Sequence, residues 1–319
     1  MKKKILISTG GTGGHVVPAL NLYNHLKNEF DVSLYTDVRG TKYIPKEIKK
    51  TIFEVKKISE KKYFFPLKII FLFFAFIKSL IHFWGNKIDI LISTGGYMSL
   101  PIVLAAKIFK KKIILFEPNS IIGKSNKFLL RFSHHVLCYD KNIIIGYKEK
   151  SIVPTHKGVI IDPILNYCFY SKRNTSETKE DIFKILIVGG SQASLFFSKY
   201  LKSEIIQLSK KYKIEITQQL APGFDIESYK KEYDKNNIKN NLFFFEDNFL
   251  CKKNNFDIAI TRAGASSLAE LAHLNIPFIS IPFPHATDNH QFFNAKRYYD
   301  LNCCWILEEK NFNSGDIYK

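Results

Sequence analysis

The chain of 319 residues contains few cysteines, few arginines and no uninterrupted apolar run of the length that spans a membrane. Its five Cys residues have no regular spacing, which argues against a disulfide framework or a zinc site and agrees with a reducing cytoplasm. Cys303 and Cys304 are predicted to be reduced, small apolar residues in a strand. The apolar run after Lys4 ends at once in the turn Ser8–Gly11, too soon for a signal peptide, so we expect a protein that is not exported.

Almost all of the positive charge comes from lysine. The formal net charge is +18 at pH 7, and Arg occurs at only five positions. A basic balance favours an anionic partner. Proteins that bind nucleic acid usually gather Arg and exposed aromatic residues into basic stripes or a reading helix, and the sequence has neither pattern. We therefore predict an anionic membrane surface, and no nucleic acid, as the partner of this charge.

Four short apolar runs, each ending in a turn that contains glycine, divide the chain. Ile5–Gly11 and Ile90–Gly96 are identical over seven residues, and the other two runs are Ile185–Ser191 and Ile258–Gly264. Continuous apolar runs of this length are typical of strands buried on both faces of a parallel sheet. Helical patterns lie between the runs, at Pro18–Asn28, Leu100–Phe109, Phe196–Lys210 and Ser266–Leu274. This alternation predicts an α/β fold with two Rossmann-like, doubly wound parallel sheets.

A polar stretch near the middle of the chain marks the boundary between the two sheets. The strand-like Gly158–Ile161 is followed by Asp162-Pro163 and then by a polar run, Ser171–Asp181, which is expected to be a linker or an exposed loop. A new strand begins at Lys184. We therefore predict an N-terminal domain of residues 1–161 and a C-terminal domain of residues 162–319.

The segment Tyr63–Trp84 is unusually apolar. A transmembrane helix needs about 20 apolar residues with few charges, and Lys68, Lys78 and His82 interrupt this segment. Two interpretations remain open, a helix buried in the core and a helix that lies in the plane of the membrane surface. Nearby lysines would each add about 1 kcal/mol of attraction to an anionic leaflet. They are Lys56, Lys57, Lys61, Lys62, Lys110, Lys111, Lys112, Lys124 and Lys127.

The first glycine-rich turn, Gly10–His15, can bring the backbone close to a ligand at the start of a helix. A dinucleotide site is one interpretation, because Asp37 ends a strand where a ribose-binding acid would lie. It is the weaker one, since Val16 occupies the third glycine position of the G-x-G-x-x-G fingerprint. His15 instead lies at the mouth of the sheet, and a neutral imidazole is suited to removing the proton of an attacking hydroxyl. His15 is therefore our candidate catalytic base.

The second half of the chain has the features of a site for an activated sugar. Gly189–Gln192 offers backbone N–H groups and the Ser191 hydroxyl to a diphosphate. In the turn Arg262–Glu270, the carboxylate of Glu270 can take two ribose hydroxyls, although a solvated helix acid is the alternative. The loop Pro282–Gln291 carries polar side chains that can hydrogen-bond a sugar.

The sequence has no pattern of metal ligands. It lacks a D-x-D motif at a strand end, and its nine His residues are poorly spaced for zinc. We therefore predict a glycosyltransferase without a metal or other cofactor, in which helix dipoles and backbone donors stabilise the leaving diphosphate.

Six motifs together resemble one known family. They are Gly10–Ala19, Gly95-Gly96-Tyr97 with Pro101, Glu117-Pro118-Asn119 with Gly123 and Asn126-Lys127, Gly189–Ala193, Arg262–Glu270, and Pro284–Gln291 with Asn294-Ala295. The chain resembles the MurG family, the UDP-N-acetylglucosamine (UDP-GlcNAc) transferases that convert lipid I to lipid II in peptidoglycan synthesis. The motifs extend along nearly the whole chain.

The resemblance implies a GT-B fold, with two Rossmann-like domains facing across a cleft, the acceptor lipid on the first and the donor on the second. It implies inversion at the anomeric carbon, a β-1,4 linkage, and a peripheral location on the cytoplasmic face of the cell (inner) membrane. It also favours the interfacial interpretation of Tyr63–Trp84 over the buried one. The substrates it implies are UDP-GlcNAc and lipid I.

The resemblance also implies a set of binding residues. Ser191 would meet the phosphates, Phe245 the uracil, and Gln291 the GlcNAc hydroxyls. By motif position, the full set that binds donor or acceptor is Thr12, Gly13, Gly14, Asn119, Ser191, Phe245, Ala265, Ser266, Ser267, Leu268, Ala269, Glu270 and Gln291.

Three departures from the family pattern keep two alternatives open. The family's H-E-Q-N is here Phe116–Asn119, its donor-contacting Arg is replaced by Leu165, and the C-terminal domain is expected to be shortened at its end, Lys319. One alternative is a related GT-B transferase that acts on another membrane lipid. The other is a degenerate copy that binds UDP-sugar or membrane without turnover.

Overall fold

In the computed structural model the chain divides into two compact units, an N-terminal unit, Met1–Tyr167, and a C-terminal unit, Cys168–Lys319. The structure describes residues 2–53, 65–96, 98–145, 153–170, 182–191, 193–246, 248–253, 255–313 and 315–317. The expected linker at 171–181, four of the lysines (56, 57, 61 and 62), Tyr97 and Gln192 lie outside the described residues. The division between the units falls a few residues after the boundary expected from the sequence.

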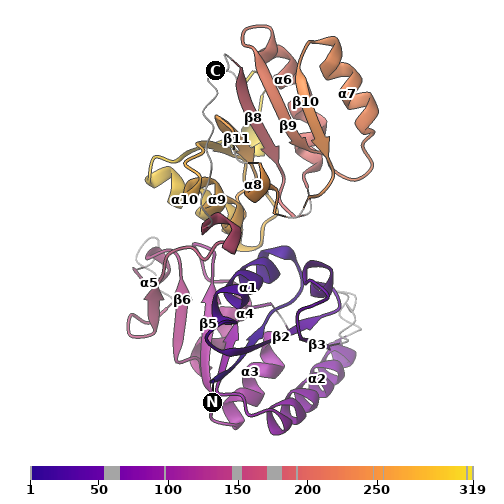
Figure 1. Cartoon of the computed structure of the whole chain (residues 1–319). Coiled ribbons are helices and arrows are strands. Elements are labelled where there is room, and N and C mark those ends of the chain that lie inside the picture. The colour runs from indigo at the N-terminus through magenta and orange to yellow at the C-terminus, as the bar shows by residue number, and fades with distance from the viewer. Residues whose placement is uncertain are drawn as a thin grey trace. The chain divides into compact units, whose positions relative to one another are not determined.

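The N-terminal unit is built on a parallel sheet with the strand order β3-β2-β1-β4-β5-β6-β7 (Figure 1). The two identical heptapeptides lie side by side in it, with Ile5 opposite Ile90 and Ser8 opposite Ser93. The chain order reverses direction between β1 and β4, which makes this the topological switch point of the sheet. The strands are β1 (Lys4–Ser8), β2 (Asp31–Asp37), β3 (Lys50–Phe53), β4 (Ile90–Ser93), β5 (Lys112–Glu117), β6 (His135–Cys138) and β7 (Gly158–Ile160).

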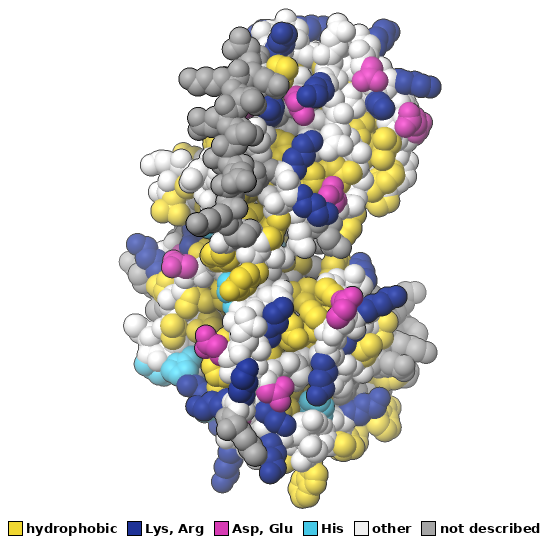
Figure 2. Space-filling model, in the orientation of Figure 1, with side chains coloured by type: hydrophobic (Ala, Val, Ile, Leu, Met, Phe, Trp, Pro, Cys, Tyr) yellow, Lys and Arg dark blue, Asp and Glu magenta, His cyan; other side chains and the backbone are white. Residues whose placement is uncertain are grey.

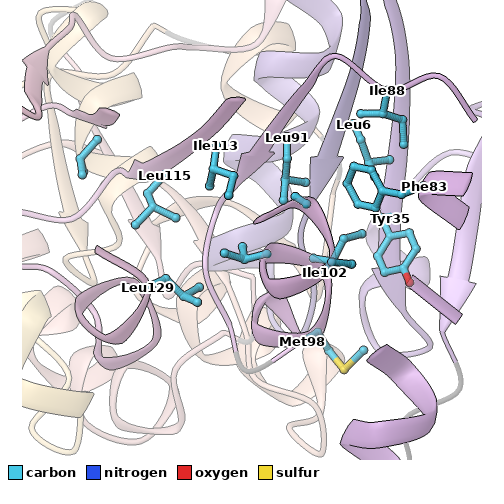
Figure 3. Packing of buried hydrophobic residues seen from close by; sticks show 14 of the residues in the cluster. Leu6, Tyr35, Phe83, Ile88, Leu91, Met98, Ile102, Ile113, Leu115 and Leu129 are labelled. Atoms are coloured by element: carbon cyan, nitrogen blue, oxygen red, sulfur yellow. The ribbon is translucent and has the colours of Figure 1, made fainter. Parts of the chain in front are cut away.

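Helices cover both faces of this sheet, because successive side chains of each strand point to opposite faces. Ile5 and Ile7 pack in one cluster with residues of the first helix, whereas Leu6 packs in another with residues of α2 and α3. Figure 3 shows the second cluster, in which Leu91 and Ile113 of the sheet point toward α3, which carries Ile102. The helices are α1 (Gly13–Leu26), α2 (Phe65–Gly85), α3 (Ser99–Ile108), α4 (Lys124–Leu129) and α5 (Asn142–Ile145), with short 3-10 turns η1 (Gly40–Tyr43) and η3 (Leu130–Phe132).

The C-terminal unit repeats the same topology with six parallel strands in the order β10-β9-β8-β11-β12-β13. Its switch point lies between β8 and β11. The strands are β8 (Phe183–Val188), β9 (Ile214–Gln219), β10 (Lys239–Phe243), β11 (Ile258–Thr261), β12 (Phe278–Ser280) and β13 (Cys304–Ile306). The helices are η6 (Phe197–Leu201, a π-helix), α6 (Lys202–Ser209), α7 (Ile226–Lys235), α8 (Phe249–Lys252), α9 (Ala265–His273) and α10 (His290–Asp300), with 3-10 turns η5 (Tyr167–Tyr170), η7 (Thr287–Asn289) and η8 (Glu309–Asn311).

The predicted α/β class with two doubly wound parallel sheets is confirmed. All four expected helices are present, with boundaries that differ by a few residues. The largest difference is in α1, which begins at Gly13 rather than Pro18, so Pro18 lies inside the helix, where it cannot donate the i→i−4 hydrogen bond.

One pair of cysteines contradicts the expectation from spacing. Cys168 and Cys251 form a disulfide, with Cα atoms 5.8 Å apart and 83 residues of sequence between them. The prediction was wrong for this pair because the fold brings η5 against α8, which the sequence spacing does not show. Cys138, Cys303 and Cys304 are free thiols.

Candidate active site

The glycine-rich turns all follow central strands, at the carboxyl ends where parallel sheets bind ligands. In the N-terminal unit they follow β1 and β4, and in the C-terminal unit they follow β8 and β11. Each pair of turns therefore lies at the switch point of its own sheet.

The first turn is fixed by a buried carboxylate at the end of the neighbouring strand. Asp37 Oδ1 accepts hydrogen bonds from the backbone N–H groups of Gly11 and Gly40, both at 2.9 Å. Its Oδ2 accepts two more from the guanidinium of Arg39, at 2.7 and 2.8 Å. Gly11 has a φ of +84°, a conformation that favours glycine. Because all four bonds of Asp37 serve the fold, this acid is not available to a ribose, and the dinucleotide interpretation loses its main support.

The second turn packs directly against the first. Gly95 and Gly96 both have a positive φ, and a Cβ atom on Gly96 would lie 3.5 Å from the carbonyl oxygen of Gly10. The hydroxyl of Thr94 donates to that of Thr9 over 2.9 Å, joining the ends of β1 and β4. The close approach of the two backbones explains why both turns are rich in glycine.

His15 lies in the first turn of α1, and its imidazole is oriented by the second glycine turn. Its Nδ1 lies 2.9 Å from the backbone carbonyl oxygen of Thr94. A carbonyl oxygen only accepts, so the hydrogen is on Nδ1 and the neutral ring keeps its lone pair on Nε2. The N-cap residue Thr12 and Gly14 are exposed, whereas Gly13 is buried. The ring therefore has the tautomer that a general base needs, next to an exposed helix start.

Asn119 is held in place by another buried carboxylate. Glu117 ends β5, and its Oε1 accepts from the side-chain amide of Asn119 at 2.8 Å and from its backbone N–H at 3.3 Å. Its Oε2 accepts from Gly123 N and Asn126 Nδ2 at 2.9 and 3.0 Å. The Glu117 carboxylate thus orders the loop after β5 and orients the predicted binding residue Asn119.

In the C-terminal unit, a glutamine orders the predicted diphosphate turn. Gly189 N donates to Gln219 Oε1 at 3.0 Å, and Gln219 Nε2 donates to the carbonyl oxygen of Phe244 at 3.0 Å. Gly190 has a φ of +81°, and Ser191 is exposed. Gln219 therefore connects the turn to the segment that carries Phe245, whose ring is more than half exposed.

The start of α9 carries the other residues predicted to contact the nucleotide. Ala265, Ser266 and Ser267 are half-buried, whereas Leu268 and Ala269 pack into the interior. The first-turn N–H groups of α9 have no cap from the side chain of the N-cap residue, Gly264. Glu270, at the end of this set, is half-buried, and desolvation raises its pKa to about 7.

Gln291 joins two loops of the donor-side region. Its Oε1 accepts from Ala263 N at 3.2 Å and from Phe283 N at 2.9 Å. Only its Nε2 group then remains to donate to a ligand, so Gln291 is suited to a hydroxyl oxygen as acceptor. Sequence reasoning identified Gln291 as a sugar-binding residue and missed its part in holding the loops.

The structure groups the predicted residues into two sets, one in each unit. The N-terminal set is Thr12, Gly13, Gly14, His15 and Asn119, and the C-terminal set is Ser191, Phe245, Ala265–Glu270 and Gln291. Sequence reasoning missed Thr94 and Gln219, although both stand at or just after strand ends, where such side chains gather. Among the residues that the structure describes, no three His, Cys, Asp or Glu side chains lie together as a metal site.

Two family models match the chain. Glycosyltransferase family 28 N-terminal domain matches residues 5–138, and glycosyltransferase family 28 C-terminal domain matches residues 184–319.

Two relatives that match nearly the whole chain carry the same name. A Pelagibacter ubique protein is 46% identical over 99% of this chain and 88% of its own length, and a Rickettsia felis protein is 34% identical over 99% and 89%. Both are named UDP-N-acetylglucosamine--N-acetylmuramyl-(pentapeptide) pyrophosphoryl-undecaprenol N-acetylglucosamine transferase.

Solved structures agree on the fold. MurG from Acinetobacter baumannii has a TM-score of 0.73 at 22% identity, over 98% of this chain and 87% of that one. A UDP-GlcNAc 2-epimerase from Methanocaldococcus jannaschii has a TM-score of 0.62 at 11% identity, over 96% and 89%. At these identities the likeness concerns the GT-B fold.

Proposed function

The chain belongs to glycosyltransferase family 28, and from this we propose that it transfers GlcNAc from UDP-GlcNAc to the muramyl sugar of lipid I, forming lipid II. The observation that carries the proposal is the identity to transferases of that name along nearly the whole chain. Lipid I is the undecaprenyl-pyrophosphoryl muramyl pentapeptide. The expectation drawn from the sequence motifs is thereby confirmed at the level of the family.

We assign the acceptor to the N-terminal unit and the donor to the C-terminal unit. The N–H of Gly189 is bound to Gln219, but Gly190, Ser191 and the start of α9 offer backbone N–H groups to a diphosphate. Phe245 offers an exposed ring on which a uracil can stack, and Glu270 offers a carboxylate to the ribose hydroxyls. Gln291 Nε2 donates to an oxygen of the transferred sugar.

The reaction is a single displacement in this assignment. The acceptor 4-hydroxyl attacks the anomeric carbon of GlcNAc while the bond from that carbon to the β-phosphate oxygen of UDP breaks. His15 Nε2 takes the hydroxyl proton, and the Nδ1–H bond to Thr94 holds the ring in the required tautomer. The charge that develops on UDP is stabilised by N–H groups of the turn that Gln219 holds in place through Gly189, and by the dipole of α9. Inversion gives the β-1,4 linkage.

We further propose that α2 docks the protein on an anionic bilayer, where a lipid-linked acceptor resides. One face of α2 packs inward through Ala75, Ser79 and Phe83, which are buried. The opposite face exposes large apolar side chains, including Trp84, which is 84% exposed. The others on this face are Ile70, Phe73, Phe74, Ile77 and Ile81. The two interpretations of this segment thus describe two faces of one helix.

Lysines border the exposed face of α2. Lys78 lies on α2 itself, and Lys87 follows it closely in sequence; both are exposed. Lys107 and Lys110 are also exposed, and they flank Phe109, whose ring contacts Phe83 and Trp84 of α2. Figure 2 shows apolar side chains at the lower edge of the N-terminal unit, where Figure 1 places α2, with Lys and Arg around them. Among the described helices, none has both the length and the apolar character needed to cross a membrane.

Transfer of radiolabelled GlcNAc from UDP-GlcNAc to a lipid I analogue tests the assigned reaction. We expect labelled lipid II. Transfer only to a different lipid acceptor would instead support the related GT-B transferase.

Binding of UDP without any product would support a UDP-sugar-binding protein without turnover. One observation favours this second candidate, because Leu165, at the position of the family's donor-contacting Arg, is buried. The loss of a cation beside a diphosphate costs a charge-assisted hydrogen bond, about 1.5–3 kcal/mol.

Co-sedimentation with vesicles that contain phosphatidylglycerol tests the membrane surface. Replacing Phe73 and Phe74 with Ser should weaken binding on the order of tenfold or more, because each buried ring contributes about 1.5–3 kcal/mol. Trp305→Ser is the matched control, since this ring is also exposed but lies in the C-terminal unit. High salt should release the protein, because such attraction is screened within about 8 Å at physiological ionic strength; binding indifferent to salt would contradict the lysine contribution.

A further inference from the structure

Arg262 is a buried arginine at the centre of the donor-side loops. It directly follows β11, and its side chain is 8% exposed. Its Nη1 donates to the carbonyl oxygen of Ile281 at 3.0 Å and approaches that of Pro282 at 3.4 Å. Its Nη2 donates to Ser194 Oγ at 2.9 Å and to the carboxylate of Glu309. Both terminal nitrogens are therefore committed to protein acceptors.

The acceptors of Arg262 belong to three segments that are distant in sequence. Ser194 follows the diphosphate turn Gly189–Ala193. Ile281 and Pro282 begin the loop that leads to Gln291. Glu309 lies in η8, after the edge strand β13. A single guanidinium thus fixes the two loops that carry Ser191 and Gln291 relative to its own turn.

Aromatic rings and one carboxylate stabilise the buried charge of Arg262. The guanidinium carbon lies 4.7 Å from the ring centre of Phe197, and the rings of Phe196 and Phe283 lie within 6 Å. The carboxylate of Glu309 is the charged partner, and it is itself mostly buried. Removing either partner leaves a buried charge without compensation, which is costly.

We propose that Arg262 is a positioning residue for the donor, and that with Glu309 it sets the spacing of the diphosphate turn and the sugar-binding loop. The inference rests on the proposed function, since it assumes that these loops hold a UDP-sugar. Because both terminal nitrogens of Arg262 donate to protein acceptors, the proposed role is exerted through these loops. The flat, forked guanidinium matches acceptors in several directions, whereas a lysine ammonium is a point charge.

Calorimetric titration with UDP tests this role in the wild type and in Arg262→Lys, Arg262→Met and Glu309→Gln. Arg262→Met should weaken UDP binding on the order of tenfold or more, the cost of losing hydrogen bonds to a charged group. Arg262→Lys should recover part of the affinity. Arg297→Met is the control, since Arg297 also contacts an aromatic ring, that of Tyr298, but lies in the last turn of α10.

Two further readouts separate positioning from a loss of folding. Thermal unfolding gives the temperature at which every variant is folded, and all titrations are made there. Guanidinium ion added to Arg262→Ala should restore UDP affinity, because it can occupy the vacated site. In turnover assays, the KM for UDP-GlcNAc should rise more than the KM for the lipid acceptor.

The outcomes are distinct. A folded Arg262→Met that binds UDP as tightly as the wild type overturns the inference, and so does an affinity loss that neither lysine nor guanidinium reverses. If the double variant Arg262→Met with Glu309→Gln binds UDP no more weakly than Arg262→Met alone, the two residues act together on UDP binding. A wild type that does not bind UDP at all contradicts the proposed function instead.

Discussion

In each unit a side chain from the adjacent strand holds the first glycine turn in place, but the side chain differs between the two units. In both, the turn follows the central strand, and its backbone N–H is held by a side chain that ends the adjacent strand, Asp37 in one and Gln219 in the other. Asp37 is charged and directs its second oxygen to Arg39. Gln219 is neutral and directs its amide to Phe244.

This difference indicates a division of roles between the turns. Asp37 pairs with Arg39 of the same unit, and neither belongs to the predicted binding residues. The first turn therefore serves to hold the helix start that carries His15. The Gln219 amide links the turn to Phe244, next to the predicted uracil contact, so one side chain orders two parts of the proposed donor site. In the proposed function, the N-terminal turn positions the catalytic base His15, and the C-terminal turn binds the donor.

The largest effect is expected from a methyl group added at Gly189, in the C-terminal turn. A Cβ atom at Gly189 would lie 2.4 Å from Ser194 N and 2.5 Å from the carbonyl carbon of Ala193, both backbone atoms that cannot move aside. Gly189→Ala should cost about 3 kcal/mol or more of unfolding free energy. It should also abolish UDP binding, measured by calorimetry beside thermal unfolding.

Gly10→Ala is the matched change in the N-terminal unit. Its Cβ would lie 3.1 Å from Asp37 Oδ1, a side-chain atom, so a smaller loss of about 1 kcal/mol is expected. UDP affinity should be unchanged. Equal losses in the two variants would contradict the difference in rigidity between the turns.

The next effect concerns chemistry alone. His15→Ala should lower kcat about 10²–10⁴-fold, the usual contribution of general base catalysis. UDP affinity should remain, because His15 lies in the other unit. His156→Ala, an exposed histidine of the N-terminal unit, is the control. Unchanged turnover in His15→Ala would remove the base assignment.

A pH effect on UDP binding is expected through Glu270. Burial raises its pKa in the folded protein to about 7, above its ordinary value. Ribose hydroxyls donate to the ionised carboxylate, so UDP binding should weaken as pH falls through about 7, approaching tenfold per pH unit. Calorimetric titrations below and above this pKa measure the change, and Glu270→Gln should show none of it.

The same shift has a consequence for stability. The folded state holds the proton more tightly than the unfolded state, so the contribution of Glu270 is fully present below the unfolded pKa. It is lost as pH rises through the folded pKa of about 7. Wild type and Glu270→Gln should therefore differ in the slope of stability against pH within this window. Parallel curves would show that the carboxylate is not buried.

The sequence predicted the features that depend on local pattern. Buried strands, the glycine turns after them and the place of His15 at a helix start follow from residue type and order, and all are present, although His15 is half-buried rather than exposed. The pairings that fix the site join residues far apart in the chain, such as Gly189 with Gln219 and Arg262 with Glu309. Topology, not local sequence, decides which strand ends meet, so these pairings could not be predicted.

Two elements departed from expectation for related reasons. The disulfide of Cys168 and Cys251 depends on a turn and a helix that only the fold brings together. The helix α2 is buried on one face and apolar on the other, so hydrophobic periodicity could not distinguish a core helix from an interfacial one.

The smallest expected effect concerns backbone strain in the C-terminal turn. Ala193 has a φ of +56°, in the left-handed region, whereas in the N-terminal turn Gly10–Gly14 only Gly11 has a positive φ. A left-handed conformation costs an L-residue about 1–2 kcal/mol, and glycine avoids this at the cost of more freedom when unfolded. Ala193→Gly should therefore raise the unfolding free energy by about 0.5–1 kcal/mol, a shift of about 2 °C in Tm.

Asn275→Gly provides the control for Ala193→Gly. Asn275 has the same φ of +56°, but it lies after α9, and Asn tolerates this region better than Ala. Its stabilisation should thus be smaller, with no change in UDP affinity. If Ala193→Gly is more stable and binds UDP less tightly, the methyl group holds the turn in its binding conformation. If UDP affinity is unchanged, Gln219 and Arg262 suffice to hold the turn, and the strain at Ala193 is a cost to folding alone.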